Sequence, residues 1–357
     1  MSYLRVRAVC FASSIALSAG LPACGGGTTE SPDAAQPNDA AMVLDAASSN
    51  DTGTTVDAHA SPDGNLPHDA ASTPDTSMDA GTHAIRTVFV VLMENHNWSD
   101  IHHSTSAPYI NGLLVTGAHA EQYFNPPAIH PSEPNYLWLE AGSNFGVLND
   151  LTPSSNHQST TDHLVSQLER AGVTWRSYQE GISGTTCPLT ATGNYAPKHN
   201  PMIFFDDVTD TNSPTSAHCI AHVRPFTELA TDLSAGTTAQ YNFVTPDLCE
   251  DMHNSCAPTN DPIRQGDDFL SRLIPQIMAS SAYTNDGLIL ITWDESEGGD
   301  FPIGMIALGP HVVAGHTTSI HYTHGSTLRT VEEIFGVPLL RDAMTQTDLA
   351  DLIGTTP

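Results

Sequence analysis

The stretch Arg86-Thr-Val-Phe-Val-Val-Leu-Met93 is a continuous apolar run that is followed directly by the polar pair Glu94-Asn95. Its β-branched residues and its lack of polar alternation are typical of a parallel strand that is buried on both faces. A second run of this kind, Gly287-Leu-Ile-Leu-Ile-Thr-Trp293, is followed by the acidic pair Asp294-Glu295. In α/β folds ligands bind beyond the carboxyl ends of such strands, so these two pairs mark the expected site.

Other apolar runs alternate with helical patterns along the rest of the chain. Further strands are predicted at residues 173–178, 241–244 and 303–308. Helices are predicted at residues 161–171, 225–233, 267–279 and 326–335. This alternation predicts an α/β fold with a central, mostly parallel sheet that helices cover on both faces.

The first 84 residues do not have the composition of a folded domain. Residues 1–24 carry two arginines and then an apolar stretch too short to span a bilayer, which is a signal-peptide pattern. The stretch ends in Leu21-Pro-Ala-Cys24-Gly25, which resembles the lipobox of bacterial lipoproteins. We therefore expect export and a lipid anchor on Cys24 at the bacterial cell envelope, with secretion as the alternative. Residues 25–84, rich in Asp, Ala, Ser, Thr and Pro, predict a disordered linker.

Residues 85–357 are expected to form one folded domain that is strongly acidic. Thirty of the 40 acidic residues and nine of the 11 basic residues lie in it, which gives a net charge near −21. Such a surface repels nucleic acid and anionic membranes, so lipidated Cys24 is the one membrane contact we expect. Because Lys198 is the only lysine in the sequence, a phosphate site would depend on a metal, backbone N–H groups and histidines. The sequence does not indicate an oligomeric state.

The domain contains four cysteines, Cys187, Cys219, Cys249 and Cys256. An even number in an exported chain predicts disulfides, and three pairings are open. We favour Cys249–Cys256, which closes a short loop, together with Cys187–Cys219. A zinc site is the alternative, although the sequence has no Cys-x-x-Cys pair.

The oxygen-rich ends of the two buried strands are candidates for a metal site. Carboxylate and amide oxygens suit a hard divalent cation, and the expected ligands are Glu94, Asn95, Asp294 and Glu295. The metal could be Ca, Mg, Mn or Zn. The alternative is that these residues cap helices and solvate loops, as Asp and Asn often do.

A candidate nucleophile, Ser132, lies in the stretch His130-Pro-Ser-Glu-Pro-Asn-Tyr136 between the two strands. Pro134 suits the first turn of a helix, which puts Ser132 at or just before the helix N-terminus. Free N–H groups stabilise an anion there, and a serine beside a divalent metal can attack phosphorus. A serine at this position is more often a simple helix cap, so the interpretation depends on its surroundings.

Three histidines, His199, His253 and His324, lie in turn-like segments after apolar runs. Imidazoles there could bind a phosphoryl oxygen, ligate a metal or protonate a leaving alkoxide. The chain has 18 histidines, and others, among them His102 and His103, are interpreted as surface or structural residues.

Five motifs occur in one order along the domain. They are MENH from residue 93, PSEPNY from 131, TPDLCEDMH from 245, TWDESEGG from 292 and HYTHGSTLRTVEEIFG from 321. Together they resemble the phosphoesterase family of acid phosphatases and phospholipases C, which belongs to the alkaline phosphatase superfamily. The resemblance extends from about residue 87 to residue 340 and implies an alkaline-phosphatase-like fold.

The resemblance also implies roles for individual residues. Glu94-Asn95 match the first metal-binding pair of the family, Asp294-Glu295 match the second, and Ser132 matches the nucleophile. The histidines His199 and His253 match residues that contact the phosphoryl group. His324 fits a C-terminal histidine of the family, and His130 and Asp251 are expected near the site.

The resemblance is greater to the acid phosphatases than to the phospholipases. The phospholipases tend to carry Pro-Asn-Arg after the nucleophile, where this chain has Pro134-Asn-Tyr136, and Gly298-Gly-Asp-Phe301 lacks a histidine that they use. We therefore expect hydrolysis of small phosphate monoesters through a phosphoserine on Ser132. The alternatives are a phospholipase C or phosphodiesterase on the same scaffold and, from another class, a non-catalytic surface-binding lipoprotein.

Overall fold

The computed structural model describes residues 85–357. The expected signal peptide, the lipidated Cys24 and the linker concern residues 1–84 and lie outside the described residues. Among residues 85–357, no helix combines the length and the apolar character that crossing a bilayer requires.

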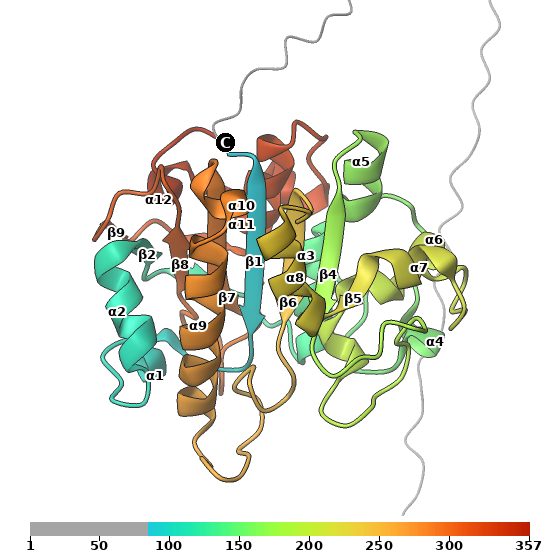
Figure 1. Ribbon diagram of the computed structural model, residues 1–357, viewed down its shortest axis with the longest axis horizontal. Coiled ribbons are helices and arrows are strands. Elements are labelled where there is room, and N and C mark those ends of the chain that lie inside the picture. The colour runs from blue at the N-terminus through green and yellow to red at the C-terminus, as the bar shows by residue number, and fades with distance from the viewer. Residues whose placement is uncertain (1–84) are drawn as a thin grey trace, which may run out of the picture. The chain divides into compact units, whose positions relative to one another are not determined.

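An eight-stranded sheet lies at the centre of the domain, in the order β5-β4-β6-β1-β7-β8-β2-β9 (Figure 1). Its strands are β1 (Thr87–Met93), β2 (Ala118–Ala120), β4 (Trp175–Gln179), β5 (Val223–Pro225), β6 (Tyr241–Thr245), β7 (Gly287–Trp293), β8 (Met305–Leu308) and β9 (Thr317–Thr318). Within this sheet only β8 runs antiparallel to its neighbours, so the expected mostly parallel sheet is confirmed. A small second sheet pairs β3 (Tyr123–Phe124) with β10 (Tyr322–Thr323).

Helices cover both faces of the central sheet. In Figure 1, α8 and α9 pass in front of the strands, whereas α3 and α11 lie behind them. The helices are α1 (Trp98–Ile101), α2 (Pro108–Thr116), α3 (Ser132–Ala141), α4 (Pro153–Asn156), α5 (Leu164–Arg170), α6 (Asp206–Thr209), α7 (Ala217–His222), α8 (Leu229–Ala235), α9 (Pro262–Met278), α10 (Ser281–Thr284), α11 (His324–Ile334) and α12 (Ala350–Ile353).

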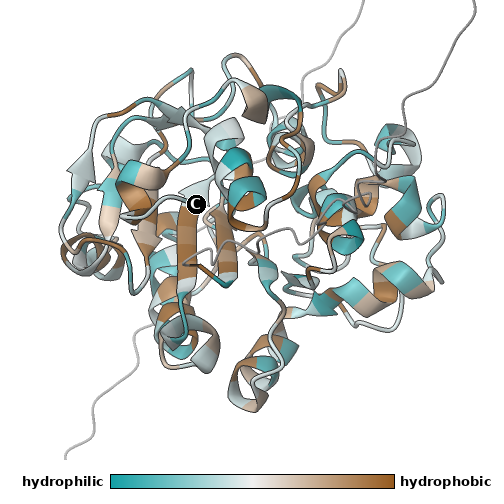
Figure 2. Ribbon diagram, turned by 90° about the horizontal axis from the view of Figure 1, so that it is seen from above, coloured by the Kyte–Doolittle hydropathy of each residue, from teal (hydrophilic) through white to brown (hydrophobic). Residues whose placement is uncertain are grey.

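The core is formed where the strands and the apolar sides of these helices meet. Every residue of β7 is buried, as the continuous apolar run predicts. The long helix α9 buries Phe269, Leu273 and Ile277, spaced four residues apart and therefore on one face. Figure 2 shows hydrophobic strands at the centre of the domain and hydrophilic segments on the helices around them.

Some predicted elements differ from the structure. The helix expected at 225–233 starts only at Leu229, because Pro225 ends β5 and the next three residues form a 3₁₀ turn. The strands β2, β5 and β9 were not predicted, since two or three residues are too few to show a periodicity.

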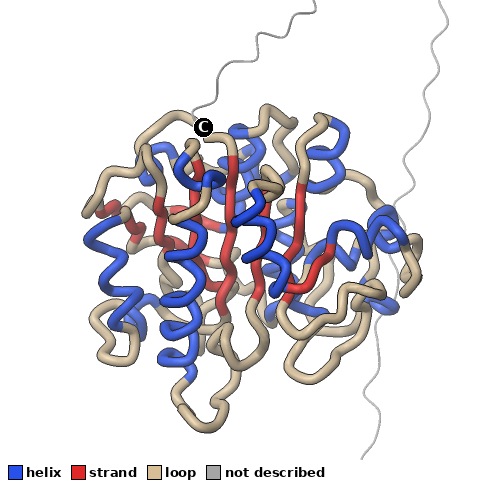
Figure 3. The backbone as a smooth tube through the Cα atoms, in the orientation of Figure 1, coloured by secondary structure: helices blue, strands red, loops and turns tan. Residues whose placement is uncertain are grey.

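The pairing of β1 with β7 sets the position of the site. Their register runs from Thr87 opposite Gly287 to Met93 opposite Trp293, so both strands end at the same level. Long loops gather at the lower edge in Figure 3, which is the edge toward which the β1 arrow points in Figure 1. The two polar pairs therefore emerge side by side.

The structure contains both favoured disulfides, Cys187–Cys219 and Cys249–Cys256. The second bridge closes the loop that follows β6 and carries Asp251 and His253. This loop reaches the end of β1, where the backbone N–H of Glu94 donates to the carbonyl of Asp251 at 2.8 Å.

Candidate active site

The ends of β1 and β7 are tied together by hydrogen bonds from Asn95. Its backbone N–H donates to Asp294 Oδ1 at 2.9 Å, and its side-chain amide donates to Glu295 Oε1 at 2.7 Å. Asn95 has a φ of +33°, a conformation that asparagine adopts more readily than most residues. The structure thus brings together Glu94, Asn95, Asp294 and Glu295, which are separated by about 200 positions in the sequence.

Asp294 carries the feature that fits a cation. Its Oδ2 atom is buried and accepts no hydrogen bond from residues 85–357. Burial and the neighbouring charges of Glu94 and Glu295 raise the pKa of Asp294 well above its usual range. A bound divalent cation would offset the repulsion among these three carboxylates, and their oxygen atoms are the ligands such an ion prefers. The residues present therefore fit the expected metal.

Ser132 lies beside these strand ends. It is the first residue of α3, it is 1% exposed, and its Oγ donates to Glu94 Oε2 at 3.1 Å. In the first turn of α3 the N–H of Glu133 donates to Asp150 Oδ1 at 3.0 Å and Pro134 has no N–H, so the N–H of Ser132 itself is the group that favours an anion at this end. The hydroxyl thus combines a contact to a predicted metal ligand with a position that stabilises negative charge.

Glu94 is fully buried and ionised. Its other oxygen, Oε1, accepts a hydrogen bond from the Tyr136 hydroxyl and lies 3.2 Å from His199 Nε2. Burial alone would raise the pKa of Glu94, but the positive charges of His199 and Lys198 and the hydrogen bond from Tyr136 lower it to about 2. The carboxylate is therefore a fixed negative charge at the end of β1.

His199 lies between two carboxylates. Its Nδ1 is 3.2 Å from Asp251 Oδ2, opposite the contact to Glu94, and its ring stacks on Tyr136 with 5.1 Å between ring centroids. Burial disfavours its charged form, but Glu94 and Asp251 outweigh that effect and raise the pKa of His199 to about 9. Burial raises the pKa of Asp251 to about 6. The two carboxylates thus favour the protonated form of His199 next to Glu94, the carboxylate that Ser132 contacts.

His253 lies on the exposed side of His199, and the two ring centroids are 5.8 Å apart. Its Nε2 is 3.4 Å from Lys198 Nζ, and Lys198 donates to Asp150 Oδ2 at 2.9 Å. Burial lowers the pKa of Lys198, but Glu94 and Asp150 outweigh it and raise that pKa above its usual value. The only lysine of the chain is therefore next to the site.

His324 is placed differently from the other candidate histidines. It is the first residue of α11 and is fully buried, with Nε2 donating to the backbone oxygen of Asp294 at 2.5 Å. Its Nδ1 lies 3.1 Å from the Tyr123 hydroxyl, and burial lowers the pKa of His324 to about 4. Both ring nitrogens are thus occupied, and the neutral ring supports the strand end rather than contacting Ser132.

His130 completes the site on the side of Glu295. The Nδ1 atom of His130 pairs with Glu295 Oε2, and its Nε2 lies 3.6 Å from Asp300 Oδ1. Burial raises the pKa of Glu295, which the positive charge of His130 partly opposes.

The sequence analysis did not identify Tyr136 and Lys198 as site residues. Tyr136 follows Ser132 by four positions, so one helix face presents both, and that spacing could have indicated a shared role. Lys198 directly precedes His199, and as the only lysine of the sequence it could have been identified as a candidate site residue.

A serine at a helix start beside buried carboxylates, on a mostly parallel sheet covered on both faces, is the arrangement expected of a phosphoric ester hydrolase. Residues 100–338 match the phosphoesterase family, and the chain belongs to that family. This confirms the resemblance that the five motifs indicate. A phosphonate monoester hydrolase from Silicibacter pomeroyi shares the fold, with a TM-score of 0.51 and 10% identity over 76% of this chain and 77% of that one.

Related sequences carry phosphatase names. The chain is 32% identical to a phosphatidylinositol-3-phosphatase of Mycobacterium tuberculosis, over 75% of this chain and 82% of that protein. It is 30% identical to a phosphate-repressible acid phosphatase of Penicillium chrysogenum, over 64% of this chain and 53% of that protein. The chain spans 50–60% of the length of the fungal acid phosphatases that it matches.

Proposed function

We propose that this chain hydrolyses phosphate monoesters through a covalent phosphoserine on Ser132. The observation that carries the proposal is the 3.1 Å hydrogen bond from Ser132 Oγ to Glu94 Oε2 at the start of α3. Family membership supports phosphate ester hydrolysis, and the names of the related phosphatases favour monoesters over diesters.

The residues that would hold a divalent cation are Glu94, Asn95, Asp294 and Glu295. Such a cation, whether Ca, Mg, Mn or Zn, would lower the pKa of a nearby hydroxyl and neutralise phosphoryl charge. Glu94 connects this set to the nucleophile, because its two oxygens contact Ser132 and the Tyr136–His199 pair separately.

The chain's own residues supply the remaining chemistry. Ser132 Oγ loses its proton to water and attacks phosphorus in line with the leaving alcohol, so that a bond from serine oxygen to phosphorus forms as the ester bond breaks. The charge of His199 and the N–H of Ser132 at the start of α3 oppose the negative charge on the equatorial oxygens. His253 lies exposed beside His199 and would give a proton to the leaving alkoxide; water then hydrolyses the phosphoserine and releases inorganic phosphate.

The test is Ser132→Ala, assayed with p-nitrophenyl phosphate. Turnover should fall by about 10³- to 10⁶-fold, as removal of a nucleophile does in other hydrolases, while the thermal midpoint stays near that of the wild type. The matched control is Ser281→Ala, which changes the exposed first residue of α10 and should leave turnover unchanged. Radiolabelled phosphate trapped at low pH should map to the peptide with Ser132. If Ser132→Ala keeps nearly the turnover of the wild type, Ser132 is not the nucleophile and the proposed mechanism is wrong.

Substrate assays in parallel separate the alternatives. Hydrolysis of phosphatidylcholine in preference to p-nitrophenyl phosphate would indicate a phospholipase C, and metal binding without hydrolysis of any phosphate ester would indicate a binding lipoprotein.

We also propose export with a lipid anchor on Cys24. Labelled palmitate should be incorporated into the wild type and not into Cys24→Ala; equal labelling of both would contradict the anchor.

A further inference from the structure

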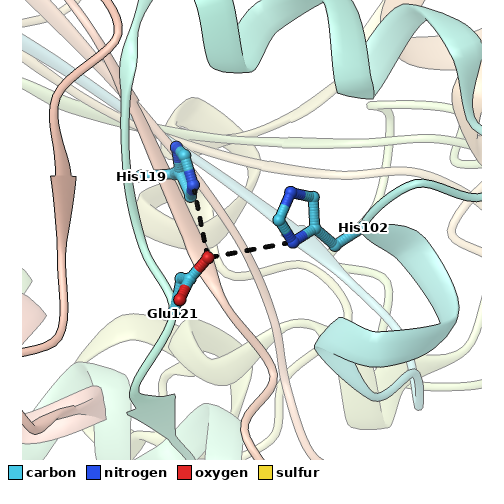
Figure 4. Close-up of side chains that lie close together, drawn as sticks. All are labelled: His102, His119 and Glu121. Atoms are coloured by element: carbon cyan, nitrogen blue, oxygen red, sulfur yellow. Dashed lines mark ion pairs between the residues drawn. The ribbon is translucent and has the colours of Figure 1, made fainter.

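A second cluster of metal-binding side chains lies outside the proposed catalytic residues. His102 directly follows α1, His119 is the middle residue of β2, and Glu121 comes just after that strand. Figure 4 shows both imidazole rings turned toward one carboxylate oxygen. His102 Nδ1 and His119 Nε2 each lie 3.9 Å from Glu121 Oε1.

The three side chains are not joined by ordinary hydrogen bonds. A separation of 3.9 Å is too long for one, and within residues 85–357 neither the His102 ring nor the Glu121 carboxylate makes a side-chain hydrogen bond. His119 is 6% exposed; its Nε2 faces Glu121 and also lies 3.4 Å from Thr317 Oγ1, whereas its Nδ1, which has no partner among the described residues, does not face the cluster. Two imidazole nitrogens and a carboxylate oxygen that converge without hydrogen-bonding one another leave room for a ligand that all three share.

The spacing fits a single metal ion. Zinc binds imidazole nitrogen and carboxylate oxygen at about 2.0–2.2 Å, so two ligands of a tetrahedral ion lie about 3.3–3.6 Å apart. The donor atoms of this cluster lie within 4.8 Å of one another, and both nitrogen-to-oxygen distances, at 3.9 Å, would have to shorten by only a few tenths of an ångström.

We propose that His102, His119 and Glu121 bind one zinc-type transition metal ion at a site separate from the catalytic centre. Two histidines and one carboxylate are a known zinc ligand set that leaves a fourth position for water or a small ligand. A pocket beside the cluster provides access to that position, and its other lining residues are Trp98, Ser99, His103, Gln122, Phe301 and Pro302.

The ion would connect α1 to β2. Trp98, the first residue of α1, donates its backbone N–H to Pro302 at 2.7 Å and packs edge-on against Trp293. A bound ion would therefore fasten the segment that follows Glu94-Asn95 to a neighbouring part of the sheet, and the stability of the domain should rise with zinc.

A second His–Glu cluster, Glu169 with His218 and His222, lacks these features. His218 Nε2 and Trp175 Nε1 both donate to Glu169 Oε1, at 2.6 and 2.7 Å, so hydrogen bonds already satisfy that oxygen. We therefore interpret this cluster as a structural ion pair and not as a metal site.

The test uses the full chain, freed of metal with a chelator and then equilibrated with zinc chloride. Bound zinc is counted by mass spectrometry in the wild type, His102→Ala and Glu121→Gln, with His103→Ala as the matched control because His103 is exposed and stacks on His102. The first two variants should bind one equivalent less, or bind it at least about 100-fold more weakly, since even outer-shell changes cost 10- to 100-fold. His103→Ala should bind as the wild type does.

Thermal midpoints show that the variants fold and give a second readout. Zinc should raise the midpoint of the wild type and of His103→Ala by more than that of the other two variants. Phosphatase turnover should stay at the wild-type level in both ligand variants. Wild-type zinc content in both His102→Ala and Glu121→Gln would overturn the proposal, and so would an equal loss in His103→Ala.

Discussion

At the scale of single residues, Glu94 is the side chain that most of the site contacts. It accepts hydrogen bonds from Ser132 and Tyr136 and pairs with His199. A fully buried charge persists only if such contacts satisfy it, so each partner helps to fix the carboxylate beside the nucleophile. This dependence can be tested at Tyr136, which sequence analysis did not select.

Tyr136→Phe removes the hydrogen bond to Glu94 and keeps the ring that stacks on His199. A hydrogen bond to a charged group contributes about 1.5–3 kcal/mol, so kcat for p-nitrophenyl phosphate should fall about 10- to 100-fold. The control is Tyr322→Phe, because the hydroxyl of Tyr322 is buried without a partner among the described residues. Unchanged kcat in Tyr136→Phe would show that Glu94 needs no such support.

At the scale of elements, His163 joins three helices away from the catalytic residues. It precedes α5, is fully buried, and bonds through Nδ1 to Glu140 of α3 at 2.8 Å and through Nε2 to Asp207 of α6 at 3.0 Å. Burial lowers the pKa of His163, but the hydrogen bonds and charges of Asp207 and Glu140 outweigh that effect and raise it to about 9. The folded protein therefore holds this proton more tightly than the unfolded chain does.

A pKa raised by folding gives stability at low pH that is lost as pH increases. The contribution of His163 should be complete below pH 6.5 and should disappear between pH 6.5 and about 9, so the free energy of unfolding should fall over that range. His163→Gln should remove this pH dependence and cost about 3–5 kcal/mol, because Glu140 stays buried without its cation. Urea unfolding across this pH range measures both effects, with exposed His103→Gln as control. An unchanged slope in His163→Gln would refute the assignment.

The two disulfides should differ in their effects on stability and activity. Cys187–Cys219 bridges residues 32 positions apart and Cys249–Cys256 residues seven apart, so replacing each pair by serine should cost about 3–4 and about 2–3 kcal/mol respectively. The shorter loop holds Asp251 and His253 within a few residues of its cysteines, whereas His199 in the longer loop lies 12 and 20 positions from Cys187 and Cys219, so the Cys249/Cys256 variant should lose more turnover. Denaturant unfolding and assays well below the thermal midpoint measure the two effects. Equal turnover of the two variants would contradict this assignment.

At the scale of the whole molecule, the excess of acidic residues leads us to expect that turnover depends on a bound metal. The domain has a net charge near −21 and one lysine, while three acidic side chains converge at the strand ends. Removal of divalent cations with a chelator should therefore abolish turnover and lower the thermal midpoint, and adding back Ca, Mg, Mn or Zn should restore both. The control is chelator saturated beforehand with the cation. Full turnover after exhaustive dialysis against chelator would contradict a metal at this site.

Local sequence patterns were enough to predict the main strands, the start of α3 and one disulfide. The apolar runs at 86–93 and 287–293 correspond to β1 and β7. Such runs are typical of parallel strands in a sheet that helices cover on both faces, because side chains on both sides of the strand are then buried. Pro134 and Ser132 marked the start of α3, and the short spacing of Cys249 and Cys256 favoured the observed pairing.

Which side chains meet could not be predicted from these local patterns, because the meeting residues lie far apart in the sequence. The register of β1 with β7 brought Asn95 to Asp294, the packing of α11 turned His324 to the backbone of Asp294, and folding gathered His102, His119 and Glu121. The physical reason is that periodicity reports how a segment buries its own side chains. Contacts between distant segments depend on strand register and helix packing, which the sequence pattern of either segment does not contain.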